Sequence, residues 1–308
     1  MISIIIPVFN SELTIENLIN SIVLNLNGKV KYEIILVNDA SEDNSENICK
    51  KLVEKFSNVS LFSLSRNFGE HNAILAGLNQ CIGDQAVIMS DDLQHTSEAL
   101  IELINYGLKE KENYDVVYTF YETKKYGFYK KFFSKFNDLI ANYLLNKPKN
   151  LYLSSFKLIN RFVINEIIKH NSPFIYLDGL ILGTTNKIGK IKVDHSNRLY
   201  GKSGYTFIKM LKLWSNMSTS FSIFPLRLSM LMGVLLSFIG FILAIIIFFQ
   251  RIFDNTVPSG FASIFVAVTV FSGVILIALG VIGEYIGRIF LLQNQKPQFI
   301  IKNSWKKK

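Results

Sequence analysis

The segment ISIIIPVFN, residues Ile2–Asn10, is an apolar run that ends in a polar residue. The run is only a few residues long and no basic residue precedes it, so we expect no cleaved signal peptide. A short apolar run of this kind, bounded by turn-forming residues, is typical of a strand buried on both faces of a sheet. The segment therefore predicts the first strand of an α/β domain.

Further apolar runs alternate with amphipathic stretches over the first two hundred residues, the pattern of a mostly parallel sheet with helices on both faces. The predicted strands after the first are Tyr32–Val37, Val59–Leu64, Gln85–Met89 and Asp115–Tyr121. Two helices are expected after capping residues, with Ser41 ahead of residues 43–56 and Thr96 ahead of residues 97–109. The predicted fold class is α/β.

Two long uncharged segments lie near the carboxyl end. Residues 228–249 and 261–283 contain no charged side chain, and the chain as a whole is 49% hydrophobic. Either segment would form a helix of roughly 33 Å, which is long enough to cross a bilayer. A wholly soluble enzyme is therefore excluded. Cys49 and Cys81 have neither a metal-ligand spacing nor a disulfide framework, and we expect both to pack as small apolar residues.

The net charge of +9 is distributed unevenly. Nine basic residues and one acidic residue lie in residues 124–161, and six basic residues and one acidic residue follow Gly283. The connection at 250–260 contains only Arg251 and Asp254 as charged residues. By the positive-inside rule, this asymmetry predicts that both termini are cytoplasmic and that the short connection is external.

Polar residues follow the first four predicted strands. In an open α/β sheet, ligands bind beyond the carboxyl ends of the strands, so these residues indicate a binding site. Each could instead cap the next helix. No glycine-rich fingerprint follows the first strand and no Walker loop occurs, which disfavours a dinucleotide-binding domain. The polar residues are Asn10, Ser11, Asn38, Asp39, Arg66, Asn67, Asp91, Asp92 and Gln94.

The ordered motifs SIIIPVFN, ILVNDAS, SRNFGEHNAILAGL and VIMSDDLQH resemble the nucleotide-sugar domain of glycosyltransferase family 2. The downstream segments SSFKLI, YLDGLIL, RLYGKSGYTF and GEYIGRIF resemble the polyprenyl-phosphate glycosyltransferases within it. The resemblance implies a cytoplasmic GT-A domain over residues 1–200, an interfacial amphipathic helix at 201–224, and a transmembrane hairpin with a basic tail at 225–308.

The resemblance implies a donor site at the strand exits. Asp39 matches the residue that holds the base or ribose of a nucleotide sugar, and Pro7 and Phe9 would line the same slot. Asn67, Gly69 and Asp91 are assigned to the donor as well. The alternative for Pro7 and Phe9 is ordinary packing at the end of a strand.

A metal site is implied by the family pattern Asp-x-Asp-x-Gln, which falls on Ser90, Asp92 and Gln94. A divalent cation, Mg²⁺ or Mn²⁺, would neutralise charge on the diphosphate leaving group. Because a serine replaces the first aspartate, Asp91 is expected to complete the set, or a water does. The alternative is that Asp91 and Asp92 only cap the next helix.

Basic residues downstream are assigned to a lipid-phosphate acceptor. Phenylalanines interleave with lysines over residues 124–135, and a second such stretch covers 205–221, which is typical of helices in the membrane interface. The competing interpretation is a nucleic-acid patch, which no other feature supports. The acceptor-phosphate residues are predicted to be Lys124, Lys125, Lys131, Ser134, Arg198 and Lys202, with Arg198 and Lys202 also counted among the catalytic residues.

Relatives often have an acidic residue in a Gly-Asp-Phe segment, where this chain has Ser154, Ser155 and Phe156. Asp92 and Asp178 are therefore the acidic candidates for catalysis, Asp178 as the residue that orients the acceptor. An Asp before Gly is equally typical of a turn.

The predicted function is an inverting, metal-dependent transfer of one sugar from a nucleoside diphosphate sugar, with a UDP-hexose favoured, to undecaprenyl phosphate. The enzyme would be a multi-pass protein of the cell inner membrane with a cytoplasmic active site, and relatives that form tetramers allow a homo-oligomer. Two alternatives stay open: transfer to another membrane lipid such as a diacylglycerol, and a weakened scaffold protein. The identity of the sugar is open.

Overall fold

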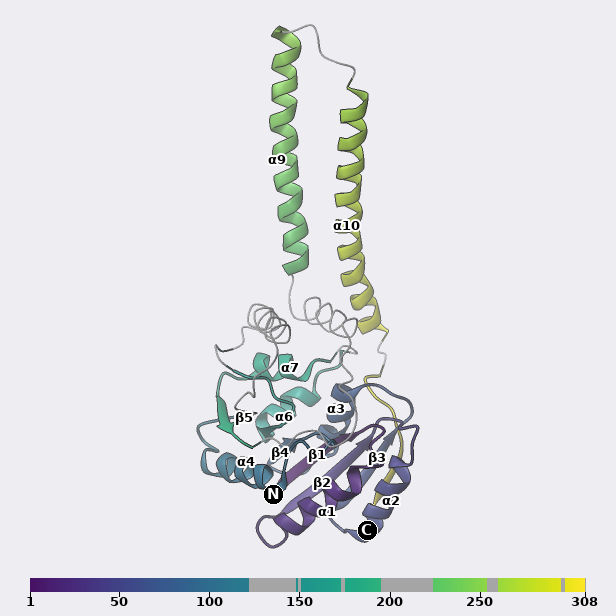
Figure 1. The fold of residues 1–308 in the computed structure, drawn as a ribbon, viewed down its shortest axis with the longest axis vertical. Coiled ribbons are helices and arrows are strands. Elements are labelled where there is room, and N and C mark those ends of the chain that lie inside the picture. Colours follow the sequence, from purple (N-terminus) through teal and green to yellow (C-terminus); the bar gives the residue numbers. More distant parts are fainter. Residues whose placement is uncertain are drawn as a thin grey trace. The chain divides into compact units, whose positions relative to one another are not determined.

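A computed structural model describes residues 1–121, 148, 151–172, 175–194, 224–253, 260–294 and 297–307. By its contacts the chain divides into two units, Met1–Thr206 together with Gln295–Lys308, and Phe207–Asn294. Figure 1 shows the elements of both. In the first unit they are β1 (Ile2–Val8), α1 (Ile15–Leu26), β2 (Tyr32–Asn38), α2 (Ser45–Lys55), β3 (Val59–Leu64), α3 (Glu70–Gln80), β4 (Gln85–Ile88), α4 (Ser97–Lys109), β5 (Val116–Phe120), β6 (Lys157–Asn160), α6 (Arg161–Ile168), α7 (Leu177–Thr184), β7 (Ile188–Lys192) and β8 (Ile301–Lys306).

The described strands form one sheet in the order β7-β5-β6-β4-β1-β2-β3-β8. The strand β1 pairs in parallel with β2 and β4, β2 with β3, and β5 with β7. Only β6 and β8 run against their neighbours. The predicted mostly parallel α/β sheet is thus confirmed, and the carboxyl ends of β1 to β4 lie at one edge, called here the ligand edge.

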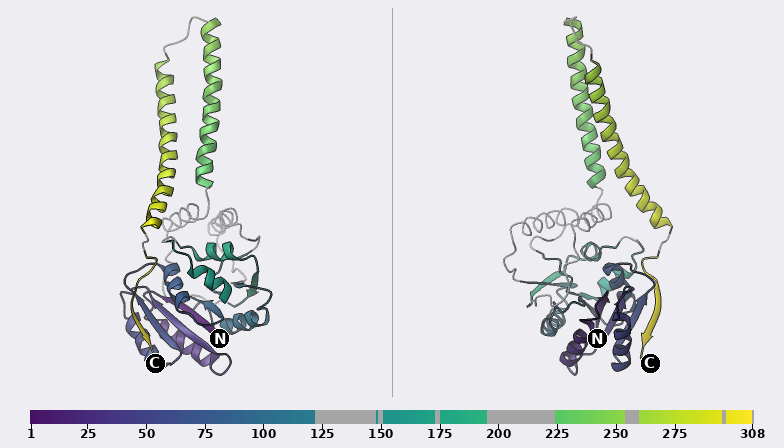
Figure 2. Two further views of the ribbon diagram at one scale, coloured as in Figure 1. Left: turned by 180° about the vertical axis from the view of Figure 1, so that it is seen from behind. Right: turned by 45° about the vertical axis from the view of Figure 1, so that its right-hand side comes forward.

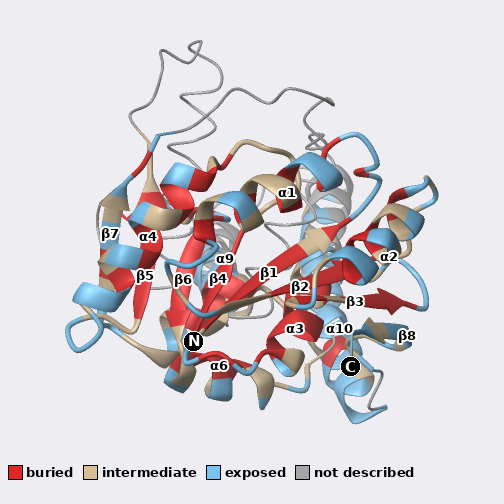
Figure 3. Ribbon diagram, turned by 90° about the horizontal axis from the view of Figure 1, so that it is seen from below, coloured by how far each residue is buried: buried red, intermediate tan, exposed pale blue. Residues whose placement is uncertain are grey.

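Helices cover the sheet on both faces, as Figure 3 shows. One buried cluster joins the sheet to α1, α2 and α4, and a second joins it to α3, α6 and α7. Along β1, Ile4 and Ile6 belong to the first cluster while Ile5 belongs to the second, and all three are fully buried. Because alternate side chains of a strand point to opposite faces, a strand covered on both faces is an unbroken apolar run.

A glycine in α3 lets this helix approach the sheet closely. A Cβ atom at Gly77 would lie 2.5 Å from Ile5 Cγ2 and 3.2 Å from Val37 Cγ2. Both methyl groups are in the core, where added volume forces side chains or backbone to shift. The close packing fixes α3 on β1 and β2, and with it the first turn of α3 at the ligand edge.

Most sequence-predicted elements agree with the structure to within one or two residues. The strand at Val59–Leu64 is confirmed residue for residue, and Thr96 is the N-cap of α4, its side chain accepting from Ala99 N at 3.2 Å. The prediction for Ser41 is wrong: α2 begins at Ser45 after Asn44, which makes no side-chain cap. Ser41 instead accepts a hydrogen bond from Asn10 N at 3.1 Å, so it links two loops.

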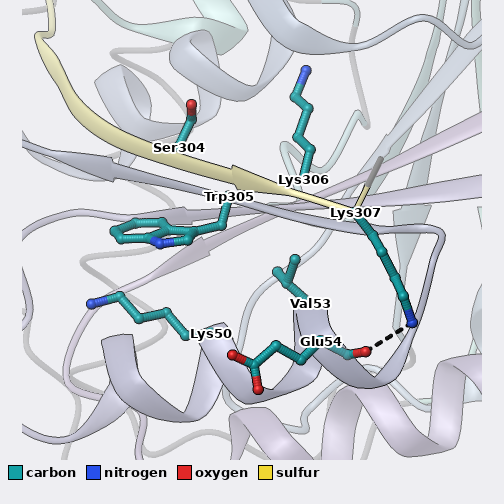
Figure 4. A pocket seen from close by; sticks show the side chains of 7 residues that line it. All are labelled: Lys50, Val53, Glu54, Ser304, Trp305, Lys306 and Lys307. Atoms are coloured by element: carbon teal, nitrogen blue, oxygen red, sulfur yellow. Dashed lines mark hydrogen bonds between the residues drawn. The ribbon is translucent and has the colours of Figure 1, made fainter.

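The carboxyl-terminal residues form β8, where the sequence predicts only a basic tail. This strand pairs antiparallel with β3, and Ser65 N donates to Ile300 O at 2.9 Å. Figure 4 shows how β8 packs on α2: Lys50 Nζ lies 4.5 Å from the centre of the Trp305 ring, and Lys307 Nζ donates to Glu54 O at 3.0 Å. A pocket of about 490 Å³ lies here. Because Trp305 pairs with Leu61 in the first half of β3, this pocket is not at the ligand edge.

The second unit contains α9 (Phe224–Phe253) and α10 (Phe261–Gln293), which contact each other. Figure 2 shows them side by side as an antiparallel pair. Both are long and apolar enough to cross a membrane, with candidate spans Pro225–Ile242 and Val270–Gln293. Only 0% and 6% of these spans are buried within the protein. Helices that expose apolar side chains all around are suited to lipid rather than to water.

Candidate active site

The connection that follows each of the strands β1 to β4 contains one residue with positive φ. The residues are Asn10 (53°), Ala40 (55°), Gly69 (92°) and Leu93 (61°). The three that are not glycine are the only such residues in the described ranges. This conformation costs side-chain-bearing residues about 1–3 kcal/mol and clusters at functional sites. All four connections lie at the ligand edge, and three of them contain a residue strained in this way.

The turns after β1 and β2 are joined by hydrogen bonds. Asn10 Oδ1 accepts from Glu42 N at 2.9 Å, and Ser11 N donates to Ser45 Oγ at 2.8 Å. Together with the bond from Asn10 N to Ser41, these contacts run between two loops far apart in sequence. Asn10 and Ser11, predicted as ligand-edge residues, therefore build the edge by bracing its loops.

Asp39 braces the turn after β3. Its two carboxylate oxygens accept from Phe68 N at 2.7 Å and from Gly69 N at 2.8 Å, immediately before α3. The side chain is 3% exposed. Burial raises the pKa of Asp39, and the two amide hydrogen bonds oppose that rise. The predicted contact with base or ribose stays a prediction, whereas the fixing of the Phe68–Gly69 turn is a role that sequence reasoning missed.

Asp91 connects the turn after β4 to the turn after β1. Its Oδ2 accepts from Phe9 N at 3.2 Å and from Ser11 Oγ. Burial raises the pKa of Asp91, the hydrogen bonds from Ser11 and Phe9 oppose the rise, and the neighbouring Asp92 adds to it. One oxygen of Asp91 is thus already engaged by the protein.

Asp92 and Gln94 flank the strained Leu93. Asp92 Oδ1 accepts from Gln94 N at 3.2 Å, so the three residues form one tight turn. Both side chains are partly exposed. Ser90 precedes this turn, and its Oγ donates to Ser155 Oγ at 3.5 Å. The Ser90 and Ser155 hydroxyl groups therefore meet at the two positions where the family resemblance implies acidic residues.

The oxygen atoms of Ser90, Asp92 and Gln94 suit a hard divalent cation such as Mg²⁺ or Mn²⁺. Among the residues that the structure describes, no group of three or more His, Cys, Asp or Glu side chains is placed to hold a metal. A cation here would need further oxygen ligands from water or from substrate phosphates, which is how magnesium commonly binds. The residues present fit such a site, with few charged ligands.

A hydroxyl network supports the turn that follows. Tyr121 OH lies 3.2 Å from His95 Nδ1 and 3.3 Å from Ser154 Oγ, and Thr119 Oγ1 donates to Phe156 O at 2.7 Å. His95 is 4% exposed, and its ring stacks on Phe156 with centroids 4.5 Å apart. His95 was not among the predicted site residues. The one feature of the sequence that indicates a place near the site is its position directly after Gln94.

Asp178 lies in the first turn of α7 and not in an isolated turn. Its Oδ1 forms an ion pair with Lys157 Nζ and accepts from Tyr118 OH at 2.8 Å. Lys157 is 2% exposed and Asp178 is 7% exposed. The buried pair ties α7 to β6 and β5. The predicted role of Asp178 toward an acceptor stays a prediction beside this structural one.

The remaining predicted residues divide into two groups. Pro7 lies in β1, Phe9 is 44% exposed directly after it, Asn67 is exposed, and Gly69 is the N-cap of α3. All four are at the ligand edge. Lys124, Lys125, Lys131, Ser134, Arg198 and Lys202, with the stretches 124–135 and 205–221, lie outside the described residues.

The chain thus combines a mostly parallel α/β sheet with a polar ligand edge, and comparison with known proteins identifies its class. Residues 3–168 match the family Glycosyl transferase family 2. The Bacillus subtilis (strain 168) protein named "Uncharacterized glycosyltransferase YkcC" is 34% identical over 98% of this chain and 94% of that protein. The chain therefore belongs to glycosyltransferase family 2 and is a glycosyltransferase.

More specific relatives and solved structures agree. The undecaprenyl-phosphate 4-deoxy-4-formamido-L-arabinose transferase of Proteus mirabilis (strain HI4320) is 28% identical over 98% of this chain and 93% of that protein. Glucosyl-3-phosphoglycerate synthase from Mycobacterium tuberculosis, solved with Mn²⁺, UDP-glucose and phosphoglyceric acid, has a TM-score of 0.52 at 16% identity over 72% of this chain and 78% of that chain. The fold is GT-A-like, and the resemblance to the polyprenyl-phosphate glycosyltransferases is confirmed.

Asp92→Asn is expected to lower the rate of sugar transfer roughly a hundredfold or more, a common cost of removing a group that stabilises developing charge. Asp91→Asn is expected to reduce it only in part, because asparagine retains an oxygen that can accept from Phe9 and Ser11. The measurement is the initial transfer rate in purified membranes. Asp84→Asn is the control, since Asp84 pairs with the chain's amino terminus at the opposite edge. A larger effect at Asp91 would mean that the metal turn is assigned one residue off.

Asp178→Asn is expected to lower the thermal unfolding midpoint strongly, because it leaves the Lys157 ammonium buried without its partner, a loss worth about 3–5 kcal/mol. Adding Lys157→Met should recover most of the midpoint. Glu166→Gln, which breaks the exposed pair with Lys169 (2.6 Å), is the control and should change stability by under about 1 kcal/mol. An unchanged midpoint for Asp178→Asn with a higher requirement for the lipid acceptor would favour the acceptor role instead.

Proposed function

We propose that this glycosyltransferase transfers one sugar from a nucleoside diphosphate sugar, with a UDP-hexose favoured, to undecaprenyl phosphate. The observation that carries the proposal is the presence in one chain of a polar ligand edge around Asp92 and of two candidate membrane-spanning helices. The name of the Proteus mirabilis relative supports a polyprenyl phosphate acceptor. The UDP-glucose and Mn²⁺ in the Mycobacterium tuberculosis structure support a UDP-sugar donor and a divalent cation.

In the proposed reaction an acceptor phosphate oxygen forms a bond to the anomeric carbon as the bond to the diphosphate breaks. A single displacement of this kind inverts the anomeric configuration. A phosphomonoester with a second pKa near about 6 is already largely deprotonated at neutral pH, so the attack needs no strong protein base. This account is compatible with Ser154 and Ser155 in the segment where the family resemblance implies an acidic residue in many relatives.

A bound Mg²⁺ or Mn²⁺ would neutralise charge on the diphosphate leaving group. Asp92 and Gln94 would hold it, with Asp91 or a water in the place of the missing first aspartate. The turn geometry supports this assignment, because Leu93 brings Asp92 and Gln94 together on one tight turn. Asp39, Pro7, Phe9, Asn67, Gly69 and Asp91 would form the donor slot.

The acceptor side of the proposal rests on charge. The acceptor phosphate would lie where the lipid headgroups begin and would need cations near the bilayer surface. Lys124, Lys125, Lys131, Ser134, Arg198 and Lys202 are assigned to it, and Asp178 to orienting it. Arg198 and Lys202 directly precede the aromatic, basic stretch at 205–221.

The connectivity supports a cytoplasmic active site in the cell inner membrane. The chain leaves the first unit, forms α9 and α10, and returns to the same sheet as β8. Two crossings would place the segments before α9 and after α10 on one side of the membrane, and the basic flanks favour the cytoplasmic side. A homo-oligomer stays a prediction.

The test of function is transfer of label from a panel of radiolabelled UDP-sugars to undecaprenyl phosphate in purified membranes that contain the protein. We expect one donor to give a lipid-linked product, and we expect EDTA to abolish its formation and added Mn²⁺ or Mg²⁺ to restore it. A diacylglycerol acceptor in parallel reactions tests the other lipid class. Absence of transfer and of donor hydrolysis with every donor would favour the scaffold alternative.

The topology predicts that a reporter fused after Lys308 is cytoplasmic and that one inserted near Thr256 is external, because the hairpin crosses the membrane twice. Paired alkaline phosphatase and fluorescent protein fusions at both positions provide the measurement, since each is active on one side only. An external reporter after Lys308 would contradict both the hairpin and the shared sheet of β3 and β8.

A further inference from the structure

Two buried polar atoms on consecutive residues of α3 have no hydrogen-bond partner in the described structure. They are His71 Nδ1 and Asn72 Oδ1, and Gln85 Oε1 is the one other such side-chain atom among the described residues. Buried polar groups in proteins are nearly always hydrogen-bonded, so an exception indicates a missing water, ion or ligand. His71 and Asn72 are in the first turn of α3 at the ligand edge, while Gln85 begins β4 at the opposite edge.

The orientation of Asn72 defines what kind of group is missing. Its Nδ2 donates to Phe68 O at 2.7 Å, so the unpartnered Oδ1 is a hydrogen-bond acceptor. The missing partner must therefore be a donor. The phosphate oxygens of a nucleotide are acceptors at neutral pH and cannot satisfy this atom, whereas a hydroxyl or amino group of the transferred sugar can, as can a ribose hydroxyl, and the two are separated by comparing binding of UDP and UDP-sugar.

His71 presents a neutral ring beside Asn72. Burial lowers the pKa of His71, and the nearby Asp178 opposes the shift in part. The ring packs edge-on against Tyr176 with centroids 5.4 Å apart, in a polar environment that includes the Lys157–Asp178 pair. A neutral imidazole has one donor and one acceptor nitrogen, which suits a hydroxyl group as a partner.

The first turn of α3 is held rigidly. Asp39 fixes the two backbone amides that precede α3. Further along this helix, Gly77 packs against Ile5 of β1. Rigid support of this kind positions side chains for a ligand without a cost of ordering on binding. The unpartnered atoms are thus built into a fixed part of the ligand edge.

We propose that His71 and Asn72 bind hydroxyl or amino groups of the transferred sugar and so help to select it. The inference rests on the proposed function, because it takes a nucleotide sugar as the donor. It assigns the sugar, rather than the nucleotide, to the first turn of α3.

Calorimetry on the full chain in detergent separates the two parts of the donor. Wild type is titrated with UDP and with UDP-glucose, UDP-galactose and UDP-N-acetylglucosamine, and the tightest sugar donor is then compared with UDP in each variant. His71→Phe keeps a ring against Tyr176 and removes both nitrogens. We expect it, and Asn72→Leu, to weaken binding of the UDP-sugar about threefold to tenfold, the value of one hydrogen bond, with UDP affinity within about twofold of wild type.

Gln85→Leu is the matched control, because Gln85 Nε2 also donates to a backbone carbonyl, Gly107 O at 3.0 Å, and its Oε1 is also unpartnered. It should leave both affinities unchanged. His71→Asn, which retains a polar atom near the position of Nδ1, should bind the UDP-sugar better than His71→Phe does, and it serves as the second variant if the phenylalanine variant fails to fold.

Equal weakening of UDP and UDP-sugar would overturn the proposal, since the residues would then act on the nucleotide or on the fold. Unchanged sugar affinity in both variants would also overturn it, because water alone would then satisfy the two atoms. If wild type binds neither UDP nor any UDP-sugar, the proposed donor itself is wrong and this assignment is wrong with it. If wild type binds the UDP-sugar and the variants keep the wild-type ratio of UDP-sugar affinity to UDP affinity, only the assignment of His71 and Asn72 to the sugar is refuted.

Discussion

The burial of β1 on both faces, at the centre of a parallel sheet, is the constraint on which the rest of the structure depends. Parallel neighbours require the chain to cross over the sheet between strands, so each of β1 to β4 ends at the same edge. Helices must cover both faces, and the two buried clusters meet that need. The exits of β1 to β4 are consequently brought to one edge, and this brings together residues spread over 85 positions, from Asn10 to Gln94.

Bringing four exits together imposes sharp turns, and polar side chains stabilise them. Asn10, Ala40 and Leu93 adopt positive φ at these turns. Asp39 and Asp91 use their carboxylates on neighbouring loops, to Phe68 and Gly69 in one case and to Phe9 and Ser11 in the other. Several residues that resemble ligand contacts by their position thus also hold the backbone of these turns.

The edge strand β8 joins the two ends of the chain into one folded unit. The residues after α10 pair with β3, and Ile300 accepts from Ser65, next to the turn that Asp39 fixes. The hairpin of α9 and α10 is therefore attached to the sheet through the chain on both sides.

The local pattern of apolar and polar residues determined the position of many elements of this protein. The apolar runs located β1 to β5 and both long helices, and the motif SDDLQH located the turn with Asp92 and Gln94, because burial on two faces and tight turns leave a direct signature in sequence. The strands β6, β7 and β8 were not predicted. Which side chains share a site was decided by the tertiary structure. Asp178 contacts Lys157, which lies 21 residues away in the sequence, and Ser90 contacts Ser155, which lies 65 residues away. The strand β8 pairs with β3 from the far end of the chain. The orphaned atoms of His71 and Asn72 became visible only in the folded chain, because burial and partner are properties of the surroundings and not of the residue. Periodicity encodes which face of an element is apolar, but the choice of partner depends on which elements pack together, and that is decided by the whole chain.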